Sequence, residues 1–228
     1  MVTCGTAIFV LNVETAMKPR GKSRIELPTR NRVEPFRQGE LDRLCGVYSI
    51  LNAIHIGLAS YTAIRFSEPR RNFRLAIDYL AARKTALDSL TNGMAMQRAF
   101  GLAKFLTRSL SDHSRQLNVE KPSALLNGTI EHLLDWVEES LALSMPVVVR
   151  LEGEFRHYSV IAGIDRTRLY LFDSGELRSI KRKDCAVRGG VHTLAATSMF
   201  RVRITRFDPT NIPPASGGVP RSKVGGSA

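Results

Sequence analysis

The sequence predicts an α+β domain in which helices come first and antiparallel strands follow. Apolar residues recur with helical spacing before Pro146, and short segments rich in β-branched residues come after it. With 228 residues, 43% of them hydrophobic, the chain is long enough for one well-buried domain. A run of helices followed by a run of strands is typical of the α+β class.

Four amphipathic helices are predicted in the first part of the chain. In the first of them apolar residues recur at i, i+3, i+4 and i+7, and the first turn contains Cys45. The turn sequence Asn127-Gly128-Thr129 suits the start of the last helix. The predicted helices are Leu44–Leu58, Phe73–Leu90, Met94–Leu110 and Ile130–Leu143.

Short strands are predicted after Pro146, which ends the helical part of the sequence. They are rich in β-branched residues and are separated by Gly, Asp and Arg. The predicted strands are Val147–Leu151, Tyr158–Ile164, Leu169–Phe172, Leu177–Ile180 and Met199–Ile204.

The two ends of the chain differ in composition from the middle. Residues 1–33 are predicted to form an N-terminal strand and a basic arm, because residues 14–32 are polar, basic and interrupted by Pro and Gly. Residues 34–208 form the predicted main domain. Residues 209–228, which are rich in Pro and Gly, are predicted to be a disordered tail.

The chain is strongly basic, with 33 Lys and Arg residues against 21 Asp and Glu residues and a formal net charge of +12. Such a charge attracts nucleic acids, acidic proteins and anionic lipids. The basic residues are dispersed and no aromatic stacking pattern accompanies them, so a solvated cationic surface is favoured over a nucleic-acid site. Nucleic-acid binding remains the less favoured alternative.

The cysteine content indicates a reducing compartment. Cys4, Cys45 and Cys185 are too few and too scattered for a disulfide framework, and no CxxC pair suggests zinc. No cofactor and no metal are predicted. No apolar run approaches the roughly 20 residues of a membrane-spanning helix. We therefore expect a cytoplasmic protein, with a secreted effector that has no signal peptide as the alternative.

The first candidate site residue is Cys45 at the start of the first predicted helix. Unpaired backbone N–H groups and the helix dipole favour a thiolate there, which makes the sulfur nucleophilic. Gly46 is expected to leave room for a substrate carbonyl. The Cys45 backbone N–H and the Gln38 side chain are expected to donate to the oxyanion that forms. Cys4 and Cys185 have no evident base and are predicted to be inert.

A histidine and an aspartate mark the second candidate segment. His157 opens one predicted strand, and Asp173 closes the next, sixteen positions later (173 − 157). A two-residue loop at Arg166-Thr167 would place their side chains on opposite faces, because side chains alternate along a strand. A three-residue loop or one β-bulge is therefore predicted, which would allow Asp173 to orient His157 and His157 to face Cys45.

Together these segments resemble the papain-like cysteine peptidase superfamily. The resemblance rests on Cys45-Gly46 opening a helix, and on His157-Tyr158-x-Val160 followed by Asp173. It is closest to the bacterial C39-like branch, which cuts after double-glycine leaders in peptide export, and it covers residues 34–205 in element order. It implies a helical lobe with the nucleophile, packed on an antiparallel sheet carrying His and Asp, with Gln38 in the oxyanion hole.

Three features depart from this branch. Gln38 lies seven positions before Cys45 (45 − 38), one more than is usual in the family. Leu44 stands where the branch often has Asp, and an Asp is found at position 42 instead. No transporter domain follows, so we expect a free-standing member with its own substrate.

The predicted function is that of a cysteine peptidase. Cys45, His157 and Asp173 would form the triad, and Gln38 would assist in hydrolysing a peptide or isopeptide bond of a protein or peptide substrate through a thioester. An acyl transferase or deamidase using the same triad is one alternative. A non-enzymatic basic binding protein on a degenerate papain-like scaffold is another. The pairs Gly217-Gly218 and Gly225-Gly226 also raise self-trimming as a hypothesis, with a flexible linker as the simpler explanation.

Overall fold

The structure is a computed structural model in which residues 24–59, 67–112, 115–123, 128–154 and 156–206 are described. Cys4, most of the predicted N-terminal strand and basic arm, and the predicted tail with its glycine pairs lie outside these residues.

The described residues form a mixed structure of helices and a largely antiparallel sheet, as the sequence predicted. The helices are α1 (Cys45–Ala59), α2 (Ser67–Ala82), α3 (Ala86–Asn92), α4 (Met96–Leu110) and α5 (Ile130–Ala142). The strands are β1 (Ile25–Glu26), β2 (Arg115–Glu120), β3 (Val147–Gly153), β4 (His157–Ile164), β5 (Arg168–Leu171), β6 (Ser179–Lys181), β7 (Cys185–Ala186), β8 (His192–Thr193) and β9 (Met199–Arg206). Single turns of 3-10 helix lie at Arg182–Asp184 and Ala196–Ser198.

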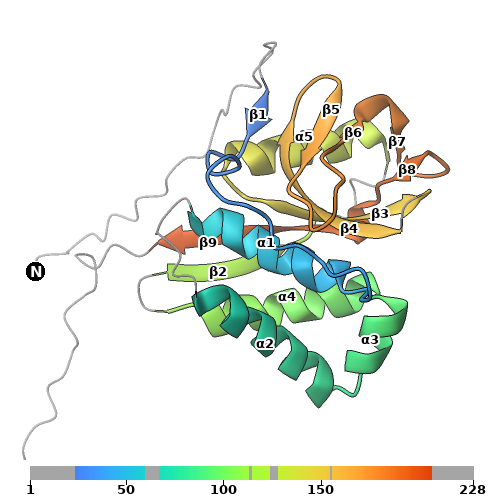
Figure 1. Ribbon diagram of the computed structural model, residues 1–228. Helices are drawn as coiled ribbons and strands as arrows, with labels where there is room; N and C mark the ends of the chain where they lie inside the picture. The colour runs from blue at the N-terminus through green and yellow to red at the C-terminus, as the bar shows by residue number, and fades with distance from the viewer. Residues whose placement is uncertain (1–23, 60–66, 113–114, 124–127, 155, 207–228) are drawn as a thin grey trace, which may run out of the picture.

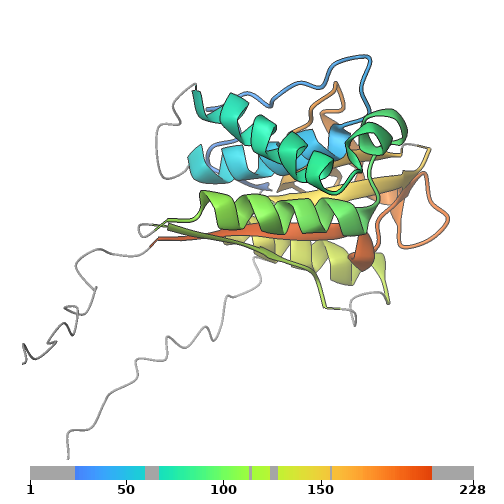
Figure 2. The same ribbon diagram turned by 90° about the horizontal axis from the view of Figure 1, so that it is seen from below.

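The main path of the sheet has the order β2-β9-β3-β4-β5-β6, and its neighbouring strands are antiparallel. Strand β1 adds to β4, while β8 joins β3 and pairs in parallel with β7. Figures 1 and 2 show α1, α2 and α4 gathered on one face of the sheet and α5 on the other. This layering places the start of α1 beside the first residues of β4.

Two predictions about local structure differ from what the structure shows. The single helix predicted over Phe73–Leu90 is two helices, α2 and α3. The chain breaks between them at Lys84, whose backbone is left-handed with φ of 56° and therefore cannot continue a helix. Strand β2 was missed altogether, because its sequence Arg-Gln-Leu-Asn-Val-Glu is mostly polar. It forms one edge of the main sheet and pairs with β9 over its full length.

One continuous hydrophobic core joins the helices to the sheet. Its largest fully buried side chains come from α1, α2, α4, α5 and several strands, and include Phe200, Ile50, Ile54, Leu80, Leu106, Leu133 and Ile161. Helix α1 is buried over most of its surface because it packs against both α4 and the sheet. No helix in the described ranges is long and apolar enough to cross a membrane.

The segment that precedes α1 is held against the domain by hydrogen bonds along its length. Leu27 N–H donates to the Ala162 carbonyl at 2.8 Å. The buried Asn52 side chain accepts from Phe36 N–H at 2.7 Å and donates to the Phe36 carbonyl at 3.2 Å. Gln38 N–H donates to the Ser174 carbonyl at 2.9 Å. The segment from Leu27 to Gln38 is therefore fixed to α1, to β4 and to the turn after β5.

Candidate active site

Cys45 is the first residue of α1, as the sequence predicted. The Asp42 carboxylate accepts from Leu44 N–H at 2.9 Å, just ahead of the helix. The N–H groups of the first helical turn have no acceptor within the helix, so they and the helix dipole favour negative charge on a nearby sulfur. The Cys45 side chain is half-buried and is a free thiol.

Gly46 packs against Met94 and Tyr158, which differs from the expectation that it leaves room for a substrate. A Cβ atom at this position would lie 2.7 Å from Met94 Cε and 3.3 Å from Tyr158 Cδ2. The space beside Gly46 is therefore filled by the protein itself. The small residue allows the start of α1 to approach β4, which brings the Cys45 sulfur to the first residues of that strand.

The predicted irregularity between β4 and β5 is a β-bulge. Ile164 pairs with Leu169, and Asp165 N–H donates to the Arg168 carbonyl at 2.9 Å across the two-residue loop Arg166-Thr167. The register then shifts between Ile161 and Gly163. Ala162 is the extra residue, and beyond it Phe172 N–H donates to the Val160 carbonyl at 2.8 Å. The shift changes which side chains share a face, and it allows the residue after Phe172 to reach His157.

His157 and Asp173 form a short polar contact at this end of the sheet. His157 Nε2 lies 2.7 Å from Asp173 Oδ2, and Asp173 is only 5% exposed. The other carboxylate oxygen, Oδ1, accepts from Gly175 N–H at 2.7 Å. Burial raises the pKa of Asp173, but the hydrogen bond and charge of His157 outweigh burial, so the pKa lies below its ordinary value. Asp173 is thus a fixed carboxylate.

The Cys45 thiol lies close enough to His157 for the two side chains to interact, while His157 Nε2 is bound to Asp173. Burial lowers the pKa of His157, yet its hydrogen bonds to Asp173 and Cys45 and their charges raise it to about 9. Burial raises the pKa of Cys45, but the His157 side chain and the backbone N–H groups of Tyr158 and Gly46 lower it overall. These opposite shifts favour transfer of the thiol proton to the imidazole.

Gln38 lies near the pair but its side chain is engaged elsewhere. Its Nε2 donates to the Asp42 carbonyl, and its backbone N–H is bound to the Ser174 carbonyl. Gln38 therefore joins the loop before α1 to the turn that carries Asp173. Its role as an oxyanion donor remains a prediction.

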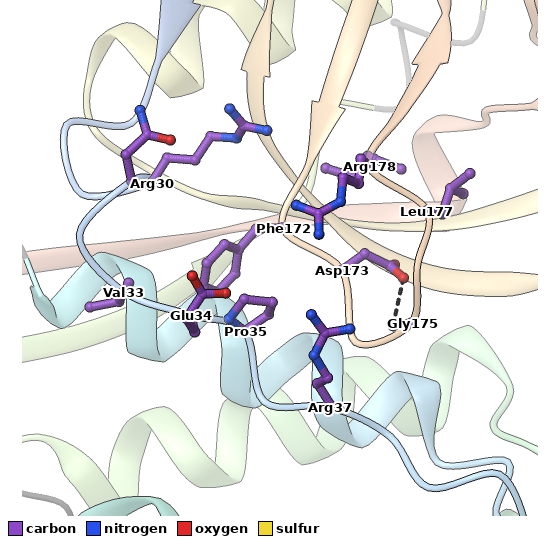
Figure 3. Close-up of a pocket in the computed structure, with 12 residues that line it drawn as sticks. Arg30, Val33, Glu34, Pro35, Arg37, Phe172, Asp173, Gly175, Leu177 and Arg178 are labelled. Atoms are coloured by element: carbon purple, nitrogen blue, oxygen red, sulfur yellow. Dashed lines mark hydrogen bonds between the residues drawn. The ribbon is translucent and has the colours of Figure 1, made fainter.

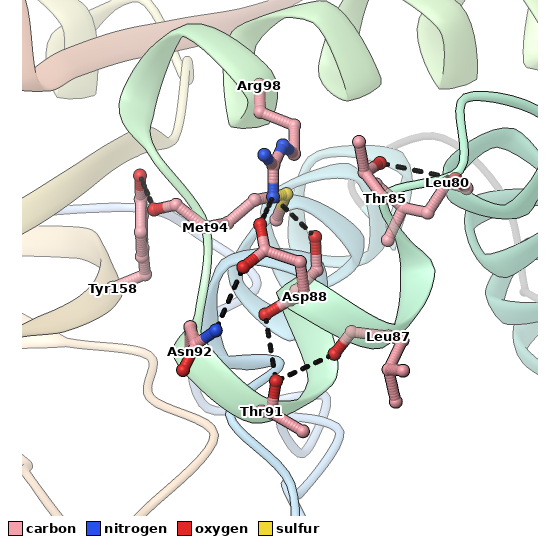
Figure 4. Close-up of polar contacts among 10 residues, drawn as sticks. Leu80, Thr85, Leu87, Asp88, Thr91, Asn92, Met94, Arg98 and Tyr158 are labelled. Carbon is pink, nitrogen blue, oxygen red and sulfur yellow. Dashed lines mark hydrogen bonds and ion pairs between the residues drawn. The ribbon is translucent and has the colours of Figure 1, made fainter.

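Supporting interactions of Tyr158 and Arg43 were not expected from the sequence. Tyr158 contributes its backbone N–H to the Cys45 sulfur, while its buried hydroxyl donates to the Met94 carbonyl at 2.9 Å (Figure 4). Arg43 N–H donates to the Leu90 carbonyl at 2.9 Å. The corner between α3 and α4 is itself fixed by Asp88, which pairs with Arg98 at 2.7 Å (Figure 4). Neither Tyr158 nor the carbonyl groups of Leu90 and Met94 carry a sequence signal for such roles.

Within the described parts of the chain, no group of three or more His, Cys, Asp or Glu residues is arranged to hold a metal ion.

Comparison with known proteins gave distant structural similarity and no match to a family or to a curated protein. A scan of known protein families and a search of curated proteins found no match. A search of solved structures found similarity to a crystal structure of a double glycine motif protease from an AMS/PCAT transporter in complex with the leader peptide. That chain has 11% sequence identity, with 77% of this chain and 91% of that chain covered, and a TM-score of 0.34. Identity and TM-score this low give no basis for transferring its activity.

Proposed function

We propose that this chain is a cysteine peptidase of papain-like architecture that hydrolyses a peptide or isopeptide bond. Cys45 acts as the nucleophile, His157 as the general base and acid, and Asp173 as the residue that orients the imidazole. The observation that carries the proposal is the position of the His157 ring, which contacts both Asp173, at 2.7 Å, and the Cys45 thiol. This is the nucleophile, base and orienter arrangement of a triad.

In the first half of the reaction the Cys45 thiolate attacks the carbonyl carbon of the substrate. The π electrons of the carbonyl move to its oxygen, which the backbone N–H of Cys45 and the Gln38 side chain are proposed to stabilise. When the oxyanion collapses, the C–N bond breaks and the leaving amine takes the proton from the His157 imidazolium. The product of this half-reaction is a thioester on Cys45.

In the second half of the reaction water hydrolyses the thioester. Neutral His157 accepts a proton from water as the oxygen attacks the acyl carbon, and the C–S bond then breaks. The acid product leaves, and the proton stays with the thiolate–imidazolium pair. Asp173 stabilises the imidazolium whenever it forms and keeps Nε2 occupied, so that the other ring nitrogen faces the sulfur.

The experiment that tests this proposal is pH-dependent alkylation by dilute iodoacetamide, with the modified residues located by mass spectrometry. The wild type should label rapidly at Cys45 below pH 7, because the thiolate is the reactive species. His157→Ala should slow labelling at pH 6 by roughly 10- to 100-fold. The thiolate fraction falls further than this, but a thiol of higher pKa is a better nucleophile once ionised.

Cys185 provides a control within the same molecule, because it is buried and its pKa is raised to about 12. If Cys45 labels no faster than Cys185, or if His157→Ala labels as fast as the wild type, the proposed triad is wrong. Should Cys45 pass this test, a peptide library compared between the wild type and Cys45→Ala would identify the substrate.

A further inference from the structure

A pocket of about 220 Å³ lies between residues 30–37 and the turn 172–178, and Asp173 is among the residues that line it. Figure 3 shows its two walls, one from the segment before α1 and the other from the turn between β5 and β6. Asp173 and Gly175 belong to the second wall. Asp173 therefore both contacts His157 and lines the pocket, whereas His157 and Cys45 are not among the residues that line it.

Three arginine side chains, Arg30, Arg37 and Arg178, line this pocket. In Figure 3 the guanidinium groups of Arg37 and Arg178 extend from opposite walls into the space between the two segments. Among the described residues, no carboxylate forms an ion pair with either of them. Both are exposed at the pocket, so neither charge is neutralised by the protein around it.

Arg30 is held by an ion pair and a ring contact, and one of its N–H donors is unsatisfied. Its Nη1 lies 3.3 Å from Glu26, and its guanidinium carbon lies 5.3 Å from the centre of the Tyr170 ring. Its buried Nε finds no hydrogen-bond acceptor among the described residues. An unsatisfied buried donor on a charged group is costly, so the Arg30 guanidinium is not fully compensated by the described residues around it.

The two acidic residues of the pocket do not cancel this positive charge. Asp173 is committed to His157 and to Gly175 N–H. Glu34 is exposed and forms no ion pair with another described residue. With Asp173 matched by the protonated His157 and Arg30 paired with Glu26, the two cations Arg37 and Arg178, unpaired among the described residues, face one solvated carboxylate.

We propose that this pocket binds a carboxylate or phosphate group through Arg30, Arg37 and Arg178. The planar guanidinium fork matches both kinds of oxyanion and forms charge-assisted hydrogen bonds with them. The pocket is also preorganised: one wall is tied to α1 by Asn52, and both walls are joined where Gln38 N–H meets the Ser174 carbonyl. The group can come from a free anion or from an acidic side chain of a peptide.

The test is an NMR titration of the full chain, read at the backbone N–H of Gly175, which lines the pocket and involves no reaction at Cys45. Inorganic phosphate, added at constant ionic strength, should shift this resonance in a saturable manner. Arg37→Gln combined with Arg178→Gln should weaken binding by roughly 10- to 100-fold, because two charge-assisted contacts are lost. The matched control is Arg70→Gln with Arg71→Gln on exposed positions of α2, which removes the same net charge.

A second titration distinguishes the sources of the anionic group. It compares N-acetyl-glutamic acid α-amide with N-acetyl-glutamine α-amide, which differ in the charge of the side chain. Saturable binding of the glutamate compound alone supports recognition of an acidic peptide side chain, and saturable binding of phosphate alone supports a site for a free anion. The proposal is overturned if neither ligand gives a saturable shift at Gly175, or if both double variants bind as the wild type does.

Discussion

Two cysteines of this protein lie beside a histidine, yet their surroundings give their sulfurs opposite chemistry. Cys45 contacts His157 at the start of α1, and Cys185 pairs with His192 across the parallel strands β7 and β8. The pKa of Cys45 is lowered. That of Cys185 is raised to about 12 by burial and by the charge of Asp184. A histidine on a neighbouring element is therefore not sufficient to lower the pKa of a thiol.

The difference lies in what stabilises negative charge on each sulfur. Around Cys45 the donors are the His157 side chain and the backbone N–H groups of Tyr158 and Gly46. The Cys185 thiol instead donates to the Lys181 carbonyl at 3.3 Å, an arrangement that favours the neutral form. Asp173 adds to this difference because it raises the pKa of His157. The protonated imidazole can then stabilise a thiolate at Cys45.

The largest expected effect comes from removing the carboxylate that supports His157. In Asp173→Ala the pKa of His157 should fall from about 9 toward 6.5, because its hydrogen bond and charge partner is lost. Labelling of Cys45 at pH 6 should slow by roughly 10- to 100-fold. NMR titration of the His157 ring measures the first change, and alkylation measures the second.

Asp173→Asn is the matched variant, since it keeps the size and an acceptor oxygen but removes the charge. The labelling rate of Cys45 should fall less in this variant than in Asp173→Ala. An unchanged His157 titration in both variants would mean that Asp173 is not what distinguishes the two cysteines.

The second prediction concerns the pH dependence of stability. The folded pKa of His157 is raised, so it contributes stability that is complete below 6.5 and is lost as the pH rises through about 9. The pKa of Cys45 is lowered, so it contributes stability that is present above 9.0 and is lost as the pH falls through its folded pKa. In the wild type the two contributions oppose each other, because one proton moves from sulfur to imidazole inside the folded protein.

Cys45→Ala removes one side of this balance. The free energy of unfolding of the variant should then fall relative to the wild type between pH 6.5 and 9, by about 1–2 kcal/mol. Urea unfolding at several pH values measures the change. Cys185→Ala, the matched control, should keep the wild-type slope between pH 6 and 8.5, and an equal slope change in both variants would contradict the assignment.

Much of this site was accessible from the sequence because its residues carry local signals. Cys45 precedes an apolar helix, and His157 and Asp173 stand at the ends of adjacent β segments. The parity of side chains even required an irregularity between those segments, and the structure has a bulge at Ala162. The contact between His157 and Asp173 follows from the pairing of β4 with β5. Alternating side chains in the sequence predict such pairing well. Whether the triad is catalytic is a prediction that the labelling experiment tests.

Other features depend on tertiary contacts that no local pattern encodes. Strand β2 is polar because it is an edge strand, and its Glu120 pairs with Arg201 and Arg203 of β9. The close packing at Gly46 involves Met94, which lies far along the chain. The arginine pocket forms where residues 30–37 meet the turn after β5. Each of these contacts joins segments that lie far apart in the sequence, so no local pattern predicts it.

The third prediction separates the two contributions of Tyr158 to the surroundings of Cys45. Tyr158→Phe removes the hydroxyl that donates to the Met94 carbonyl but keeps the backbone N–H near the sulfur. It should lower the free energy of unfolding by about 1 kcal/mol, because one buried hydrogen bond is lost. Labelling of Cys45 at pH 6 should change by less than about threefold, since the thiolate keeps its donors. A loss as large as that of Asp173→Ala would show that the hydroxyl, and not the backbone, supports Cys45.

The smallest effect is expected at Cys185. Cys185→Ala should lower the free energy of unfolding by about 0.5–1 kcal/mol, because a small, mostly buried side chain is shortened. Labelling of Cys45 should be unchanged. In the wild type Cys185 should react only when the region around β7 and β8 opens, since its burial and its raised pKa both suppress the native thiolate. Its labelling rate should therefore rise with added urea, while that of Cys45 stays constant until the domain unfolds. If Cys185 labels at a rate independent of urea, its thiol reacts in the native state and burial is not what makes it inert.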